Sequence, residues 1–228
     1  MKNSKTWAII GAVGVGILLI SNRKKIVDIA ISMVRTFKNE GNWEPETAKG
    51  AKQDTGNYYR DVYYGTNYGV TAPFLVAFKS ILKIELTPTV IKDLTKEKAA
   101  WCFAQTEGKH MRYDEMTNQF VADFIFDWMI QRPDTCVTYM AENIFAIPKK
   151  GALNGRIFSD AFVARINGTD PAGLYNALKY WRLHHLTYTL TYKSFRKGVF
   201  NRIVRFQDFE DTASVTDMIE KARKVAFG

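Results

Sequence analysis

A single carboxylate at the end of a predicted helix is the first feature of the chain that could do chemistry. Apolar residues recur at helical spacing up to Phe37, and Gly41 ends the helix directly after Glu40. Burial beside Phe37 and Trp43 would raise the pKa of this carboxyl group, so Glu40 could protonate the oxygen of a glycosidic bond. The alternative from spacing alone is that Glu40 is only a solvated helix end.

An aromatic and glycine-rich segment from Asp61 to Thr71 predicts short strands and turns that face Glu40. Asp61 or Thr66 could position a water molecule, as in inverting enzymes whose two groups stand roughly 6.5–9.5 Å apart. Asp54 is a further candidate for this second group. Aromatic faces stack on sugar rings while their polar edges form hydrogen bonds. The residues predicted to bind the sugar are Trp43, Tyr64, Asn67 and Tyr68.

The two segments resemble motifs of the glycosyl hydrolase 108 family of phage and bacterial muramidases. Glu40-Gly41-x-aromatic resembles its E-G-G-Y motif, and the segment from Asp61 to Thr71 resembles D-x-G-G-A-T-N-Y-G-I-T. Two later segments also resemble the family. Its L-F-D motif is matched by Phe124-Ile-Phe126-Asp127-Trp128. The F-x-K-G-W-x-N-R-V motif that ends its peptidoglycan-binding partner domain is matched by Phe195-Arg-Lys-Gly198-Val-Phe-Asn201-Arg202-Ile203. The chain departs from these motifs at Asn42, Tyr63, Tyr64 and Val199.

The resemblance implies a lysozyme-like muramidase that cleaves the β-1,4 bond between N-acetylmuramic acid and N-acetylglucosamine, with Glu40 as the acid and no cofactor. It also implies a phage enzyme for host lysis or for wall penetration during infection. Two alternatives stay open: a lytic transglycosylase acting on the same bond, and a structural virion or membrane protein that binds the wall without cleaving it.

Composition limits the partners. The formal net charge of +9 favours polyanions, but the sequence shows no nucleic-acid-binding motif, so we expect wall polymers and lipid rather than nucleic acid. The adjacent histidines His184 and His185 face different sides of a predicted helix and His110 is distant, so we expect no metal site.

The N-terminal segment is apolar and uncharged from Trp7 to Ile20. We predict a single-pass membrane helix over residues 7–22, although a helix of this apolar run reaches only about 21 Å. A signal peptide is the competing interpretation. The expected location is the host inner membrane or a virion membrane, with the catalytic part facing the periplasm or cell wall.

The predicted fold class is α+β and mostly helical: a lysozyme-like catalytic unit with a small β-hairpin region after the membrane helix. The expected parts are an anchor (1–25), a catalytic part (26–119), a helical peptidoglycan-binding-like part (120–206) and a helical tail (207–228). Five residues are predicted to begin helices: Thr71, Thr87, Thr95, Ser159 and Asp170. Asp127 lies in a nearly all-apolar helix and therefore needs a buried partner.

Overall fold

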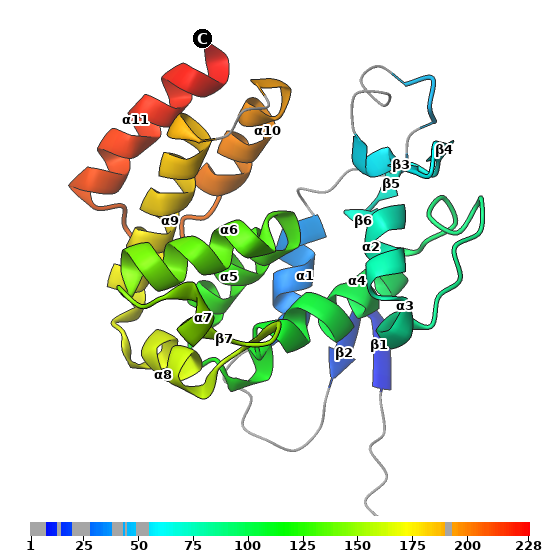
Figure 1. Cartoon of the computed structure of the whole chain (residues 1–228). Coiled ribbons are helices and arrows are strands. Elements are labelled where there is room, and N and C mark those ends of the chain that lie inside the picture. Colours follow the sequence, from blue (N-terminus) through cyan, green and yellow to red (C-terminus); the bar gives the residue numbers. More distant parts are fainter. Residues whose placement is uncertain are drawn as a thin grey trace, which may run out of the picture. The chain divides into compact units, whose positions relative to one another are not determined.

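The computed structural model describes residues 8–12, 15–19, 28–37, 43, 45–48, 55–189 and 193–228. The chain divides into two compact units, Met1–Lys109 and His110–Gly228. Helices dominate, and short antiparallel hairpins supply the strands (Figure 1). The predicted mostly helical α+β class with a small hairpin region is therefore confirmed. The division into four parts stays a prediction.

The N-terminal apolar run forms a hairpin. Strand β1 (Ala8–Ala12) pairs antiparallel with β2 (Val15–Leu19), with Ala8 opposite Leu19 and Gly11 opposite Gly16. The predicted membrane helix over residues 7–22 is thus wrong for these residues. Glycine lowers helix stability by about 1 kcal/mol per position relative to alanine, and β-branched isoleucine and valine favour strands. In the part of the chain that the structure describes, no helix is both long and apolar enough to span a membrane.

Helix α1 (Ile29–Phe37) leads toward the candidate site. Met33, Ser32 and Thr36 on this helix are buried, so its inward face is partly polar. Helix α4 (Lys96–Phe103) continues into the π-helix η3 (Ala104–Gly108). A Cβ at Gly108 would come 2.5 Å from Cδ1 of Ile29, so the missing side chain allows α1 to lie close to η3.

Two hairpins follow the short 3-10 helix η2 (Thr55–Asn57). Strand β3 (Tyr58–Tyr59) pairs with β4 (Val62–Tyr63), and β5 (Thr66–Asn67) pairs with β6 (Val70–Thr71). Their two-residue turns have positive φ at both positions, 50° and 63° at Arg60 and Asp61 and 49° and 78° at Tyr68 and Gly69. This backbone matches the twist of the flanking strands, which explains how such short strands pair.

Thr71 ends β6 and begins helix α2 (Ala72–Ala77), which is followed by α3 (Lys79–Leu82). The hydroxyl of Thr71 accepts a hydrogen bond from the backbone N–H of Phe74 at 3.2 Å. The same capping begins two later helices, where Ser159 accepts from Phe162 N at 3.2 Å and Asp170 from Gly173 N at 2.7 Å. These three predicted helix starts are confirmed, as is the one at Thr95, whose hydroxyl accepts from Lys98 N at 3.2 Å. The helix predicted to begin at Thr87 is wrong, because residues 88–93 form turns.

The second unit surrounds helix α5 (Gln119–Gln131), whose residues from Val121 to Met129 are all buried. Figure 1 shows the last three helices side by side at the C-terminal end of the chain. The other elements are η4 (Tyr113–Glu115), α6 (Pro133–Thr138), the π-helix η5 (Tyr139–Ile144), α7 (Lys149–Ala152), β7 (Leu153–Asn154), β8 (Ile157–Phe158), α8 (Asp160–Gly168), α9 (Pro171–Tyr188), α10 (Lys193–Val204) and α11 (Ala213–Phe227).

Asp127 joins three of these helices through a buried ion-pair cluster. Its Oδ2 accepts from Arg182 Nη2 of α9 at 2.8 Å, and Arg202 Nε of α10 donates to both carboxylate oxygens at 2.9 and 2.8 Å. Burial alone would raise the pKa of Asp127, but Arg202 and Arg182 together hold it below its usual range. The cluster therefore gives the predicted buried carboxylate a structural role.

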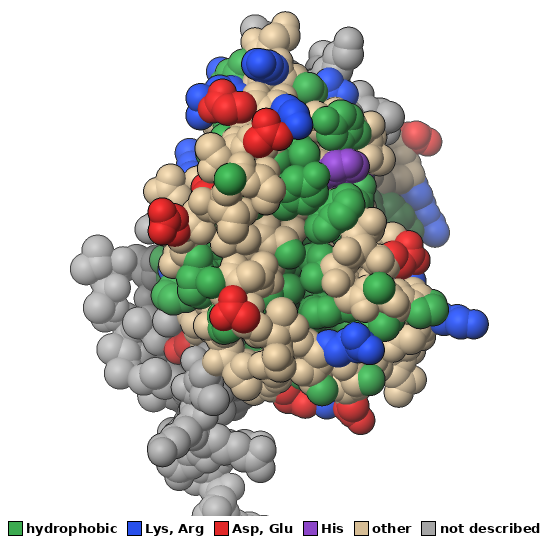
Figure 2. Space-filling model, turned by 90° about the vertical axis from the view of Figure 1, so that its left-hand side faces the viewer, with side chains coloured by type: hydrophobic (Ala, Val, Ile, Leu, Met, Phe, Trp, Pro, Cys, Tyr) green, Lys and Arg blue, Asp and Glu red, His purple; other side chains and the backbone are tan. Residues whose placement is uncertain are grey.

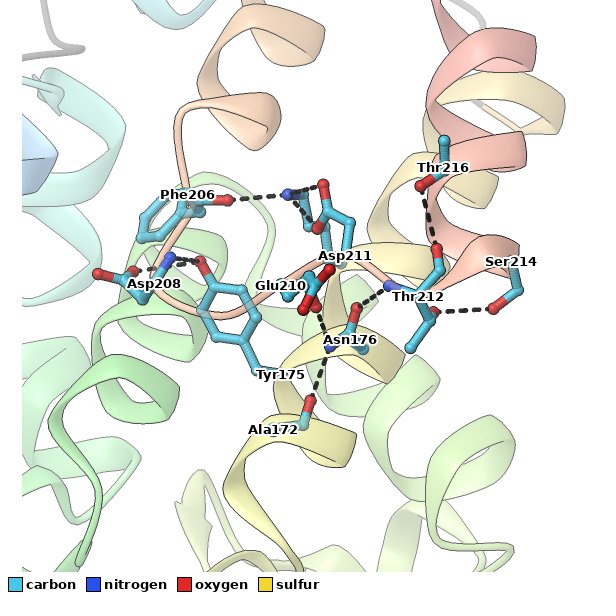
Figure 3. Close-up of polar contacts among 11 residues, drawn as sticks. Ala172, Tyr175, Asn176, Phe206, Asp208, Glu210, Asp211, Thr212, Ser214 and Thr216 are labelled. Carbon is cyan, nitrogen blue, oxygen red and sulfur yellow. Dashed lines mark hydrogen bonds and ion pairs between the residues drawn. The ribbon is translucent and has the colours of Figure 1, made fainter.

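Polar side chains of α9 also hold the connection between α10 and α11 (Figure 3). Asn176 donates to the carbonyl of Glu210 at 3.1 Å and accepts from Thr212 N at 3.0 Å. Lys179 is fully buried and donates to both carboxylate oxygens of Asp211 at 2.6 and 2.8 Å. These bonds fix where α11 begins.

Candidate active site

Glu40, the predicted proton donor, lies outside the described residues, as does the alternative second group Asp54. The structure does describe Phe37 and Trp43, each three residues from Glu40. Both contact the segment from Tyr64 to Tyr68, which the sequence predicted to face Glu40. The rings of Phe37 and Tyr68 lie 5.8 Å apart between centroids.

Asn67 links Trp43 to the rest of the site. Its Oδ1 accepts from the backbone N–H of Trp43 at 3.1 Å. Its Nδ2 lies within hydrogen-bonding distance of three backbone carbonyls, those of Ile91 at 3.0 Å, Lys92 at 3.2 Å and Leu94 at 3.2 Å. Only 4% of Asn67 is exposed. Its amide is therefore occupied by protein contacts, and it holds Trp43 in place.

Trp43 and Tyr68 supply the aromatic surfaces of the site. The indole Nε1 of Trp43 donates to the carbonyl of Tyr64 at 2.9 Å, so the ring is held at one edge. Lys92 Nζ lies 5.3 Å from the Trp43 ring centroid, and Lys96 Nζ lies 5.7 Å from that of Tyr68. Half-buried rings with nearby ammonium groups suit a sugar that carries hydroxyl and carboxylate groups.

The two candidates for the second catalytic group differ in environment. Thr66 is half-buried and its hydroxyl donates to Asn57 Oδ1 at 2.7 Å. Because that bond uses the only hydroxyl proton, the oxygen lone pairs of Thr66 are left to accept from a water molecule. Asp61 is exposed at the tip of the β3–β4 hairpin with φ of 63°.

Two residues of this unit were missed by the sequence analysis. Asn57 is buried, and its carbonyl accepts from Tyr64 N at 2.8 Å and Gly65 N at 3.1 Å while its side chain holds Thr66. Glu107 is a carboxylate with 6% exposure in the π-helix η3. Insertions of π-helix are frequent at functional sites. Glu107 could have been found from the sequence, because it follows the apolar stretch Ala99–Ala104.

Replacement of Asn67 by alanine is expected to destabilise the first unit. The change removes the acceptor of Trp43 N and the donor to three carbonyls. Each buried group left without a hydrogen bond costs about 1–3 kcal/mol before relaxation and hydration reduce that cost. We therefore expect the free energy of unfolding to fall by about 2–3 kcal/mol. Urea denaturation followed by circular dichroism measures the change. Asn154→Ala, at an exposed position, is the control. Equal stability of the two variants would show that the Asn67 bonds contribute nothing.

Comparison with known proteins identifies a solved structure with a similar fold. No protein-family model matches the sequence, and no curated protein matches it. The chain is similar to the solved structure of Brucella abortus SagA, with a TM-score of 0.59 and 19% sequence identity over 88% of this chain and 96% of that one. At this identity the similarity shows a shared fold.

Proposed function

We propose that the chain is a peptidoglycan hydrolase of the muramidase type, which cleaves the β-1,4 bond between N-acetylmuramic acid and N-acetylglucosamine with Glu40 as the proton donor. The motifs around Glu40 and from Asp61 to Thr71 support this activity through their resemblance to glycosyl hydrolase 108 enzymes. The fold shared with SagA is compatible with it but carries no activity by itself.

The observation that carries the proposal is that both flanks of Glu40 contact one hairpin segment. Phe37 packs on Tyr68, and Trp43 donates to the carbonyl of Tyr64 and to Asn67 Oδ1. Glu40 is three residues from each of these flanks, and we propose that its carboxyl group lies beside their rings. A carboxylic acid beside two aromatic rings is the environment that a proton donor to a leaving sugar oxygen requires.

In the proposed reaction Glu40 protonates the bridging oxygen as the glycosidic bond breaks, and water attacks the sugar carbon from the opposite side. The attacking water releases one proton to the solvent, and the Glu40 carboxylate takes a proton back from the solvent for the next cycle. We assign Thr66 to hold this water, because its hydroxyl proton is already given to Asn57 and its oxygen can accept from water. Asp61 stays the alternative. The net charge of +9 favours approach to the anionic wall, where we propose that the enzyme acts during phage lysis or infection.

Product analysis tests the proposed reaction. Purified cell-wall sacculi are incubated with the protein, and the released fragments are identified by mass spectrometry. Hydrolysis leaves reducing N-acetylmuramic acid ends, which is the expected result. Anhydro ends would assign the protein to the lytic transglycosylases, and absence of fragments would leave a wall-binding protein without catalysis.

A further inference from the structure

Two lysines of the first unit lie beside the aromatic rings of the candidate site, and the proposed reaction gives them no role. Nζ of Lys92 is 5.3 Å from the ring centroid of Trp43, and Nζ of Lys96 is 5.7 Å from that of Tyr68. Both lysines are exposed, and neither has an ion-pair partner in the part of the chain that the structure describes. We call Lys92 and Lys96 the lysine pair.

The backbone that carries the lysine pair is fixed to the site. Asn67 Nδ2 lies 3.0–3.2 Å from three carbonyls of residues 91–94, while Asn67 Oδ1 accepts from Trp43 N at 3.1 Å. Thr95 caps α4, so that Lys96 is the first residue of this helix. One buried side chain therefore holds both an aromatic residue of the site and the segment from which the two flexible ammonium groups extend.

The acids that adjoin the lysine pair in the sequence do not neutralise it. Asp93 and Glu97 are exposed, and neither forms an ion pair with Lys92 or Lys96. Elsewhere the charges are mixed: on the face of the protein that Figure 2 shows, acidic and basic side chains are interspersed. A lysine ammonium carries three hydrogen-bond donors and a compact positive charge, so two of them beside one site suit carboxylate groups of a ligand.

We propose that the lysine pair binds free carboxylate groups of the stem peptides of peptidoglycan and makes the site prefer glycan strands whose stem peptides are not amidated. A stem peptide is attached to the N-acetylmuramic acid unit next to the bond that Glu40 is proposed to break. A sugar that packs on Trp43 or Tyr68 would therefore bring these carboxylates near the ammonium groups. The inference rests on the proposed function for the identity of the substrate.

Removing charge from the enzyme and from the substrate in turn tests this selectivity. Sacculi freed of phosphate-containing polymers are compared with the same sacculi after their stem carboxylates have been converted to amides, and the rate of solubilisation is measured at low substrate concentration. Wild type should solubilise the unmodified sacculi about five-fold faster, the size expected of two exposed ion pairs. The preference should shrink at about 0.5 M salt, which screens such pairs.

The variants separate the lysine charges from the fold. Lys92→Gln combined with Lys96→Gln should slow solubilisation of unmodified sacculi by about five-fold and leave that of amidated sacculi unchanged. Arginine at both positions keeps the charges and should keep the preference. Lys98→Gln is the matched control, because Lys98 is exposed, lies 3.9 Å from the ring centroid of Trp101 and is two residues from Lys96, so it faces another side of α4. It should behave as wild type.

An equal loss on both kinds of sacculi would overturn the inference, because the lysines would then act on the fold or on the catalytic group. A preference that survives in the double glutamine variant, or an equal loss in Lys98→Gln, would also overturn it. If wild type solubilises neither substrate, the proposed catalysis fails, and the lysine pair is tested by binding alone. Full-length protein is then titrated calorimetrically with soluble N-acetylglucosaminyl-N-acetylmuramyl tetrapeptide and with its amidated form. The double glutamine variant should bind only the unmodified form more weakly, by about five-fold, and unchanged binding would refute the site.

Discussion

Glu40→Gln is expected to lower the rate at which the protein solubilises purified cell walls by about 100-fold to 10,000-fold, the usual contribution of a general acid. Glutamine keeps the shape of the side chain but has no proton of suitable acidity for the leaving oxygen. Binding to sacculi should be unchanged, so the loss should fall on turnover. Turbidity clearing and release of reducing ends measure the rate.

Glu46→Gln provides the matched control, since it makes the same chemical change at an exposed position six residues away. Glu46 accepts a hydrogen bond from the Tyr58 hydroxyl at 2.9 Å, and the amide oxygen of glutamine can replace that acceptor. We expect wild-type clearing from this variant. Equal clearing by Glu40→Gln and wild type would remove Glu40 from the mechanism.

Asp127→Asn is expected to destabilise the second unit by about 3–5 kcal/mol, because it leaves the guanidinium groups of Arg182 and Arg202 buried without their counter-charge. For a unit of this size, a loss of that order lowers the melting temperature by roughly 10 °C or more. Urea denaturation at pH 7 measures the change in the free energy of unfolding. Asp134→Asn breaks an exposed pair with Lys149 and should change it little.

The Asp127 ion-pair cluster makes the stability of the second unit depend on pH. The folded-state pKa of Asp127 is lowered, so its contribution to stability is fully present above the unfolded-state value of about 4 and is lost as the pH falls below it. Wild type should therefore lose stability steeply below about pH 4, and Asp127→Asn should lack this component. Adding Arg182→Met to Asp127→Asn should recover part of the loss, because one buried positive charge is then removed. No recovery would contradict the charge-balance explanation.

Local features of the fold followed from the sequence because a few neighbouring residues decide them. Thr71, Ser159 and Asp170 each cap a helix within three residues, and the nearly all-apolar pattern around Asp127 indicated a buried helix. The sequence analysis missed the hairpin of residues 8–12 and 15–19. A short apolar run is compatible with either a helix or a strand, and the sequence pattern alone does not distinguish the two.

Tertiary structure alone decided which groups meet. Asn67 bonds carbonyls 24–27 residues away, and Asp127 pairs with arginines 55 and 75 residues away. The sequence showed that Asp127 needed a partner and that Arg202 stood in a motif, but not that they would join. A helix cap depends on adjacent backbone, whereas the partner of a buried charge depends on how the whole chain folds, and no local pattern encodes that choice.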